Sequence, residues 1–190
     1  MFDGYREPSG EDSAALVSLY EKLISEHSSP FFDTEQYEQI VEFYLQSDQI
    51  KKARDVVEYA LVQYPFATTL LLHYAHIKIY DNEIQEAFEI AEKVRLLEPS
   101  NPEVFVLLGN AYDEMGQYKM AIQEYEKALS FDSDKDDIYL YMAYSYENWD
   151  RYDKAIEVLK LALIQNPENQ QALSELAFCC DFSDTEHNST

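Results

Sequence analysis

The chain has 190 residues, which is enough for one ordinary domain or for a short array of repeats. Hydrophobic residues make up 46% of it, with only four glycines and six prolines, and this composition excludes a disordered or fibrous protein. The chain carries 37 acidic and 14 basic residues, a formal charge of −23. Such a negative field repels nucleic acids and anionic membrane surfaces, so we expect partners that are proteins or peptides with basic or neutral aromatic surfaces.

Several function classes lack their sequence signals. Cys179 and Cys180 are the only cysteines, and being adjacent they form no C-x-x-C pair for zinc or redox chemistry. The acidic N-terminus has no apolar run and no stretch reaches the length of a membrane span, so we expect a cytoplasmic protein. The glycines are isolated, and no serine or cysteine has a phased histidine partner. We therefore expect no catalytic residue and no cofactor.

The first predicted element is an amphipathic helix over residues 11–27, which we interpret as an N-terminal cap. Its apolar face holds Leu16, Leu19, Tyr20, Leu23 and Ile24. After it, Asp33 is expected to cap the next helix, with Gln36 reaching back and Phe32 packing on Tyr37.

A period of 34 residues governs the middle of the chain. Pro65, Pro99 and Pro167 lie at multiples of this spacing, and Ser133 takes the remaining point. Two rows of small residues share the period: Ala53, Ala87, Ala121 and Ala155, then Ala60, Val94, Ala128 and Ala162. Small side chains at a fixed phase indicate places where two helices approach closely. The repeats predicted in this way are 34–67, 68–101, 102–135 and 136–169.

Each repeat resolves into two amphipathic helices and a short turn. In the third repeat, PEVFVLLGNAYDEM and KMAIQEYEKALSF flank a turn at Gly116, and Pro102 falls in a first helical turn, where proline is tolerated. A fifth repeat begins over residues 168–182, but its second helix is missing. Residues 1–10 and 183–190 are predicted to be tails.

The stretch LGNAYDEMGQYKMAIQEYEKALSFDS resembles a tetratricopeptide repeat, with its Leu-Gly pair, tyrosine, turn glycine and two phased alanines in register. The resemblance covers all four repeats. It implies an all-α fold, an α-solenoid of stacked antiparallel helix pairs in a right-handed superhelix over residues 11–182. It also implies that the first helix of each pair lines a concave groove that binds peptides.

The resemblance identifies the residues expected to face this groove. None of the groove positions in the four repeats is lysine or arginine, and eight are acidic. The candidate peptide-binding residues are Glu42, His73, His76, Tyr80, Glu103, Asn110, Asp113, Tyr141, Tyr144, Glu147 and Asn148. Tyr144 is the better tyrosine candidate, since Tyr141 could lean into the neighbouring repeat.

These residues favour one mode of recognition. Some family members hold a C-terminal carboxylate with groove lysines, an arginine and asparagines, and here Asn110 alone could serve. A groove with central apolar residues and tyrosines surrounded by carboxylates fits a basic or amphipathic peptide instead. We expect a non-catalytic scaffold for protein–protein interaction.

His73 and His76 raise the question of a metal site, since imidazoles three residues apart on a helix can share an ion. A third ligand would have to come from a neighbouring helix, for example Glu42 or Asp113. We expect polar lining of the groove, with a pH-sensitive contact as a side role, and no metal.

The alternative function is self-assembly. Phe178, Cys179 and Cys180 make the last helix an incomplete cap, although a buried cysteine is usually simple hydrophobic filling. Such a helix end could stack on a second copy, which would make the chain a homo-oligomer.

Overall fold

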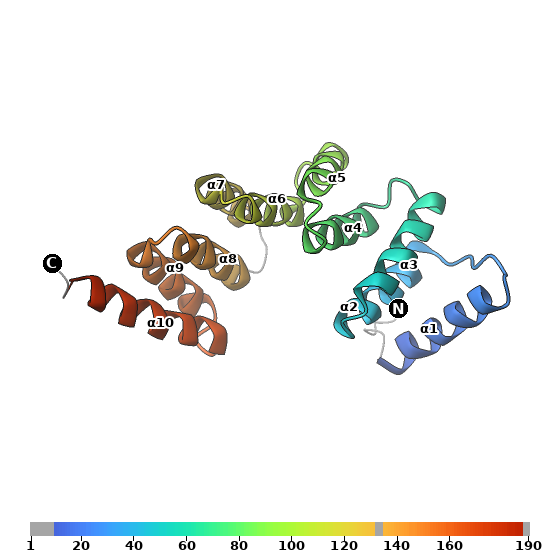
Figure 1. The fold of residues 1–190 in the computed structure, drawn as a ribbon, viewed down its shortest axis with the longest axis horizontal. Helices are drawn as coiled ribbons and strands as arrows, with labels where there is room; N and C mark the ends of the chain where they lie inside the picture. The colour runs from blue at the N-terminus through green and yellow to red at the C-terminus, as the bar shows by residue number, and fades with distance from the viewer. Residues whose placement is uncertain (1–9, 132–134, 188–190) are drawn as a thin grey trace, which may run out of the picture. The chain divides into compact units, whose positions relative to one another are not determined.

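The computed structural model describes residues 10–131 and 135–187, and within these ranges the chain forms ten α-helices and no strand, packed as adjacent pairs (Figure 1). The predicted all-α fold of stacked helix pairs is confirmed. The helices are α1 (Gly10–Ser25), α2 (Thr34–Gln46), α3 (Ile50–Gln63), α4 (Thr68–Tyr80), α5 (Ile84–Leu97), α6 (Pro102–Glu114), α7 (Tyr118–Leu129), α8 (Lys135–Asn148), α9 (Tyr152–Gln165) and α10 (Gln170–His187).

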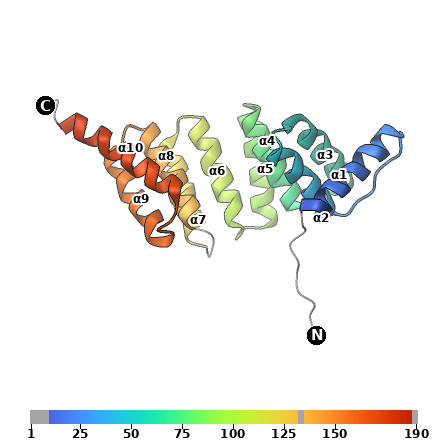
Figure 2. The same cartoon turned by 90° about the horizontal axis from the view of Figure 1, so that it is seen from below.

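The chain divides into two compact units, residues 1–77 and 78–190, and the division falls inside α4. In unit 1, α1 packs on α2 and α2 packs on α3. In unit 2, each helix from α5 to α10 packs on the next one in the chain (Figure 2). In all of these pairs, helices that follow one another in the sequence are also neighbours in space.

The start of α2 is fixed by local side-chain chemistry. The Asp33 carboxylate accepts the backbone N–H of Gln36 at 2.9 Å, and the Gln36 side chain accepts the N–H of Asp33 at 3.1 Å. The Phe32 ring meets the edge of Tyr37 with centroids 5.6 Å apart. The predicted cap and the predicted Phe32–Tyr37 contact are both confirmed.

The turn inside each repeat has one geometry, repeated every 34 residues. One residue in each turn adopts a left-handed backbone with φ between 55° and 69°. These residues are Asp48, Asn82, Gly116 and Asp150. The N–H of the following residue donates to the carbonyl five positions earlier at 2.8–2.9 Å, which closes the end of the first helix. Glycine, asparagine and aspartate tolerate this conformation best, so the turn residues of the sequence account for the helix pairs.

The phased small residues lie where the helices meet. All eight of them have no exposed surface. They are Ala53, Ala60, Ala87, Val94, Ala121, Ala128, Ala155 and Ala162. Since interiors are packed as densely as organic crystals, a larger side chain at any of these positions would push its helix away from the neighbouring one.

Gly109 is a further small residue at a close contact between two helices, but it does not belong to either of the two rows of phased small residues. A Cβ atom added there would lie 2.3 Å from the Tyr125 ring, so the aromatic ring of α7 occupies the space of the missing side chain. Ala143 and Leu159, the residues one period later, are both fully buried. A smaller partner on the second helix thus accompanies a larger residue on the first.

The first and last helices extend into the residues that the sequence assigned to the tails. Gly10 is the first residue of α1, and residues 183–187 belong to α10. The rest of the two predicted tails, residues 1–9 and 188–190, lies outside the described residues. The division of 11–182 into a cap, four repeats and a partial fifth stays a prediction.

Among the described residues, no helix combines the length and the apolar character needed to cross a lipid bilayer.

Replacing Gly109 with alanine should lower the free energy of unfolding by about 1–3 kcal/mol, because the new methyl group overlaps the Tyr125 ring. Urea unfolding followed by circular dichroism measures this change. In a Tyr125→Leu background, which imitates the Ala143–Leu159 pair, the same substitution should cost clearly less. An equal cost in both backgrounds would contradict the direct contact.

Candidate functional site

The predicted groove residues of unit 1 connect α2 to α4. The Thr69 hydroxyl donates to Glu38, and Nε2 of His73 lies 3.8 Å from Oε1 of Glu42. In both pairs the residue on α4 is 31 positions after the residue on α2. This constant offset places the groove positions of two successive first helices side by side.

The structure places His73 and His76 differently. His73 is half-buried beside Glu42, whereas His76 keeps contact with solvent. The protein around His76 removes part of the hydration of its imidazole, and this effect together with the neighbouring His73 lowers the pKa of His76 below its usual range. No group of three or more potential metal ligands occurs among the residues that the structure describes. The expectation that Glu42 and the two histidines provide polar lining of the groove stays a prediction.

Three predicted residues of unit 2 lie at helix ends and are exposed. Tyr80 ends α4 with 69% of its surface exposed, Glu103 lies in the first turn of α6, and Asn148 ends α8. The backbone N–H of Glu103 donates to Oδ1 of Asn101 at 2.9 Å, which caps the start of α6. These side chains are accessible to a partner.

Asn110 and Asp113 form a hydrogen-bond network with the second helix of their own repeat and with the next repeat. The Tyr125 hydroxyl lies 2.8 Å from Oδ1 of Asn110 and 2.9 Å from Oδ2 of Asp113. The Ser145 hydroxyl on α8 donates to the same Asp113 oxygen at 2.6 Å. Asp113 thus links α6, α7 and α8 as well as lying on the predicted surface.

The electrostatics of this network follow from its burial. Loss of hydration raises the pKa of Asp113, and the hydrogen bonds from Ser145 and Tyr125 oppose that rise. Oδ1 of Asp113 is buried and has no hydrogen-bond partner among the described residues. Keeping the Asp113 carboxylate charged in this site therefore costs desolvation free energy, and a nearby cation would reduce this cost.

The two candidate tyrosines have different surroundings. Tyr141 stacks on Tyr125 with ring centroids 6.0 Å apart and is 37% exposed. Tyr144 lies against α10, where its hydroxyl accepts from Gln171 at 2.7 Å and is 3.3 Å from Oε1 of Glu175. Tyr141 presents one ring face while the other packs, and Tyr144 is half-buried. The sequence-based preference for Tyr144 stays a prediction.

Glu147 is the second carboxylate of this surface with a shifted pKa. Desolvation raises its pKa, a hydrogen bond from the Cys179 thiol opposes the rise, and the nearby Glu175 adds to it. Burial and the Glu147 carboxylate raise the pKa of Cys179 to about 12, so the thiol stays protonated and donates its hydrogen to Glu147. Cys179 is fully buried, whereas Cys180 is exposed.

Together these contacts form a polar ladder within each unit, in which side chains of one first helix bond to the next first helix. In unit 1 it joins α2 to α4. In unit 2 it runs from α6 through α8 to α10. Sequence reasoning missed Ser145, Gln171, Glu175 and Cys179. Gln171 and Glu175 lie one period after Asp137 and Tyr141, so applying the groove phase to the incomplete fifth repeat would have found them.

Comparisons with known proteins place this architecture in a group of repeat proteins. A family model described as "TPR repeat" matches residues 109–148, and one described as "Tetratricopeptide repeat" matches residues 136–169. Comparison with the curated protein sequences finds no match.

Several solved structures share the fold. TTC0263, a thermophilic TPR protein in Thermus thermophilus, superposes with a TM-score of 0.75 at 16% identity, covering 90% of this chain and 91% of that one. MamA superposes with a TM-score of 0.61 at 18% identity over 82% and 87% of the two chains. The Arabidopsis OM64 TPR domain gives 0.53 at 19% identity, over 60% of this chain and 93% of that domain. Identities this low establish the fold alone.

The raised pKa of Asp113 predicts a pH-dependent effect of one substitution. The folded chain binds this proton more tightly than the unfolded chain, so the group lowers the free energy of unfolding increasingly as the pH rises from about 4, its unfolded value, through its folded value. Asp113→Asn removes this penalty. Relative to the native chain, the variant should therefore gain free energy of unfolding between pH 4 and pH 7 in urea titrations.

Glu126→Gln on the exposed face of α7 is the control, and it should show no comparable gain. A difference between Asp113→Asn and the native chain that stays constant with pH would contradict the shifted pKa.

Proposed function

Because the chain belongs to the tetratricopeptide repeat family, we propose that it is a non-catalytic scaffold whose first helices bind a basic or amphipathic segment of a partner protein. We name the proposed binding surface the acidic face. It consists of Glu42, His73, His76, Tyr80, Glu103, Asn110, Asp113, Tyr141, Tyr144, Glu147 and Asn148.

The observation that carries the proposal is the sign of the charge on this surface. Its charged members are carboxylates, and none of its positions is lysine or arginine. Most lysines and arginines lie instead on the second helices and turns, for example in the Lys127–Glu124 and Lys154–Glu157 ion pairs. A partner segment with positive charges would be attracted to the first helices and oriented along them.

Two desolvated carboxylates add a thermodynamic reason. Burial raises the pKa values of Asp113 and Glu147, so each pays for its charge in the free protein. An ammonium or guanidinium group brought close by a partner would favour the charged form of both. Binding and deprotonation would then be linked, and affinity would fall as the pH drops and these carboxylates take up protons.

Tyrosine supplies the apolar contacts. Tyr80 and Tyr141 are exposed, and Tyr141 is held in place by its stacking on Tyr125. A tyrosine whose ring is already ordered loses little conformational entropy on binding, and tyrosines are frequent anchors at protein interfaces.

A charge reversal on the first helices tests the proposal. A peptide array should show enrichment of amphipathic sequences rich in lysine and arginine, and the variant Glu103→Lys/Asp137→Lys, changed at exposed positions of α6 and α8, should lose them. We expect at least about a tenfold loss in affinity by fluorescence anisotropy, since opposite charges become like charges.

The matched control is Glu126→Lys/Glu157→Lys, which makes the same change in charge on α7 and α9 at exposed positions. It should retain binding within a few-fold. A preference for peptides with acidic C-termini, or an equal loss in the control variant, would contradict the acidic face.

The second candidate is self-assembly, which the surface of α10 favours. Leu173 is 42% exposed, and Ala177 and Cys180, which lie on the same side of α10, are exposed as well. Phe178 and Phe182 lie on the other side, against Tyr152 of α9. An apolar helix face of this kind is the surface that a further repeat would cover in a solenoid, and a second copy could cover it instead.

Multi-angle light scattering tests this candidate on the full chain. If α10 stacks, the particle mass should exceed the 22.2 kDa of one chain at high concentration and return to it in a Leu173→Glu/Ala177→Glu variant. Glu replacements at exposed positions leave the packing of α10 on α9 intact. A native particle with the mass of one chain at every concentration would rule out stacking.

A further inference from the structure

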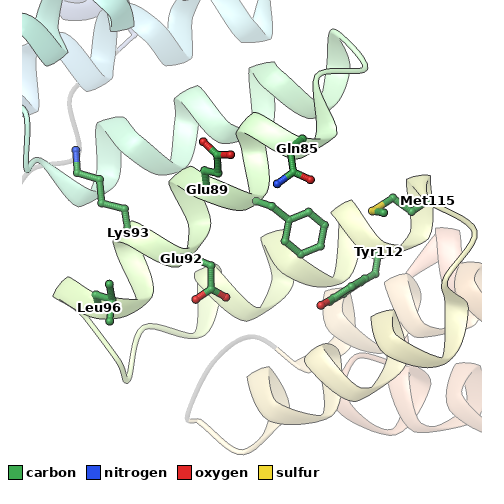
Figure 3. Close-up of a pocket in the computed structure, with 8 residues that line it drawn as sticks. Gln85, Glu89, Glu92, Lys93, Leu96, Tyr112 and Met115 are labelled. Carbon is green, nitrogen blue, oxygen red and sulfur yellow. The ribbon is translucent and has the colours of Figure 1, made fainter.

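Unit 2 contains a cleft that the acidic face does not include. It has a volume of about 590 Å³ and is formed by one side of α5 and the end of α6 (Figure 3). Its lining residues are Gln85, Phe88, Glu89, Glu92, Lys93, Leu96, Tyr112 and Met115. None of them is a member of the acidic face, so the cleft is a separate surface feature.

The floor of the cleft is apolar. Phe88 and Tyr112 meet edge to face with centroids 4.7 Å apart, which fixes both rings. Leu96 at one end and Met115 at the other are 80% and 48% exposed. A large exposed leucine and a flexible methionine beside two ordered rings make a surface that gains by being covered.

The edge of the cleft carries carboxylates. Glu89 is exposed along α5, and Glu92 forms an ion pair with Arg95 at 2.5 Å. Lys93 also belongs to the lining, but Figure 3 shows its amine at the end of the cleft far from Tyr112. Acidic groups therefore lie closest to the apolar centre.

The aromatic centre of the cleft is specific to this repeat. At the position of Phe88 the other repeats carry Arg54, Ile122 and Ile156, so none of them offers an aromatic ring there. An exposed apolar residue at the position of Leu96 does recur, in Val62 and Ile164. The combination of an exposed leucine with two ordered rings therefore does not follow from the repeat alone.

We infer that this cleft is a docking site for an amphipathic helix of a partner protein that places one large apolar side chain between lysines or arginines. The stripe from Gln85 to Leu96 runs about 16 Å along α5, which matches about three turns of a helix lying alongside it. The volume accommodates apolar side chains, and the exposed Glu89 complements a flanking positive charge, while Glu92 already pairs with Arg95. A second copy of this chain is a poor occupant of this cleft, because a chain with 37 acidic and 14 basic residues supplies few positive charges to face Glu89.

Methionine-methyl NMR tests the site residue by residue, since the chain has four methionines and Met115 is the one in the cleft. The probe is a helical peptide composed of leucine and lysine, and its twin has glutamate in place of lysine. The lysine peptide should shift the Met115 signal with saturation, and the glutamate twin should not. Met142, which is buried in α8, serves as the internal reference.

Leu96→Gln should weaken the Met115 titration about tenfold, because the partner loses the contact with one exposed leucine. Ile164→Gln is the matched control, since Ile164 lies two periods later on α9 and is 70% exposed. It should leave the titration unchanged. Because Leu96 lines the cleft and is not a member of the acidic face, a weaker titration in this variant separates binding in the cleft from binding of the same peptide to the acidic face.

Three results would overturn the inference. They are a Met115 signal that stays in place, an equal response to the lysine and glutamate peptides, and an equal effect of the Leu96 and Ile164 substitutions. A concentration-dependent shift of Met115 without peptide would show that a second copy occupies the cleft, which also overturns it.

Discussion

The structure depends on how closely paired helices approach one another. Eight phased small residues, fully buried, fix this approach, and a left-handed residue every 34 positions returns the chain at the required point. Because no repeat buries its apolar surface alone, each helix is stable only through its neighbours. Gly109 shows how strict the constraint is, since the ring of Tyr125 fills the volume that a methyl group would need. The polar ladder exists because this packing holds successive first helices at one spacing.

The sequence predicted the features that are local or periodic. The cap at Asp33, the turn at Gly116 and the buried Ala121 each depend on residues within a few positions, or on repetition, and both kinds of signal are visible in a sequence. The network of Asp113 with Ser145 was not predictable, because it requires the rotation between two repeats. The burial of Lys78 beside Glu83 and Glu86 likewise emerges only in three dimensions.

Charged residues are distributed differently on the first helices and on the second helices. The groove positions of the first helices hold no basic residue, while the second helices and turns carry lysines and arginines in ion pairs with nearby carboxylates. Burying a carboxylate costs free energy, and loss of hydration is the main reason why the pKa values of Asp113 and Glu147 are raised, with smaller contributions from the neighbouring Glu114 and Glu175. A surface selected for stability alone would mix its charges, and the proposed binding of a positively charged segment would account for the difference.

Zero-length cross-linking between carboxylates and amines, followed by mass spectrometry, tests the central proposal most directly. A bound lysine-bearing peptide should become linked to carboxylates of the first helices, among them Glu103, Asp137 and Glu175. Links that spare all first-helix carboxylates and occur only on the second helices would contradict the account.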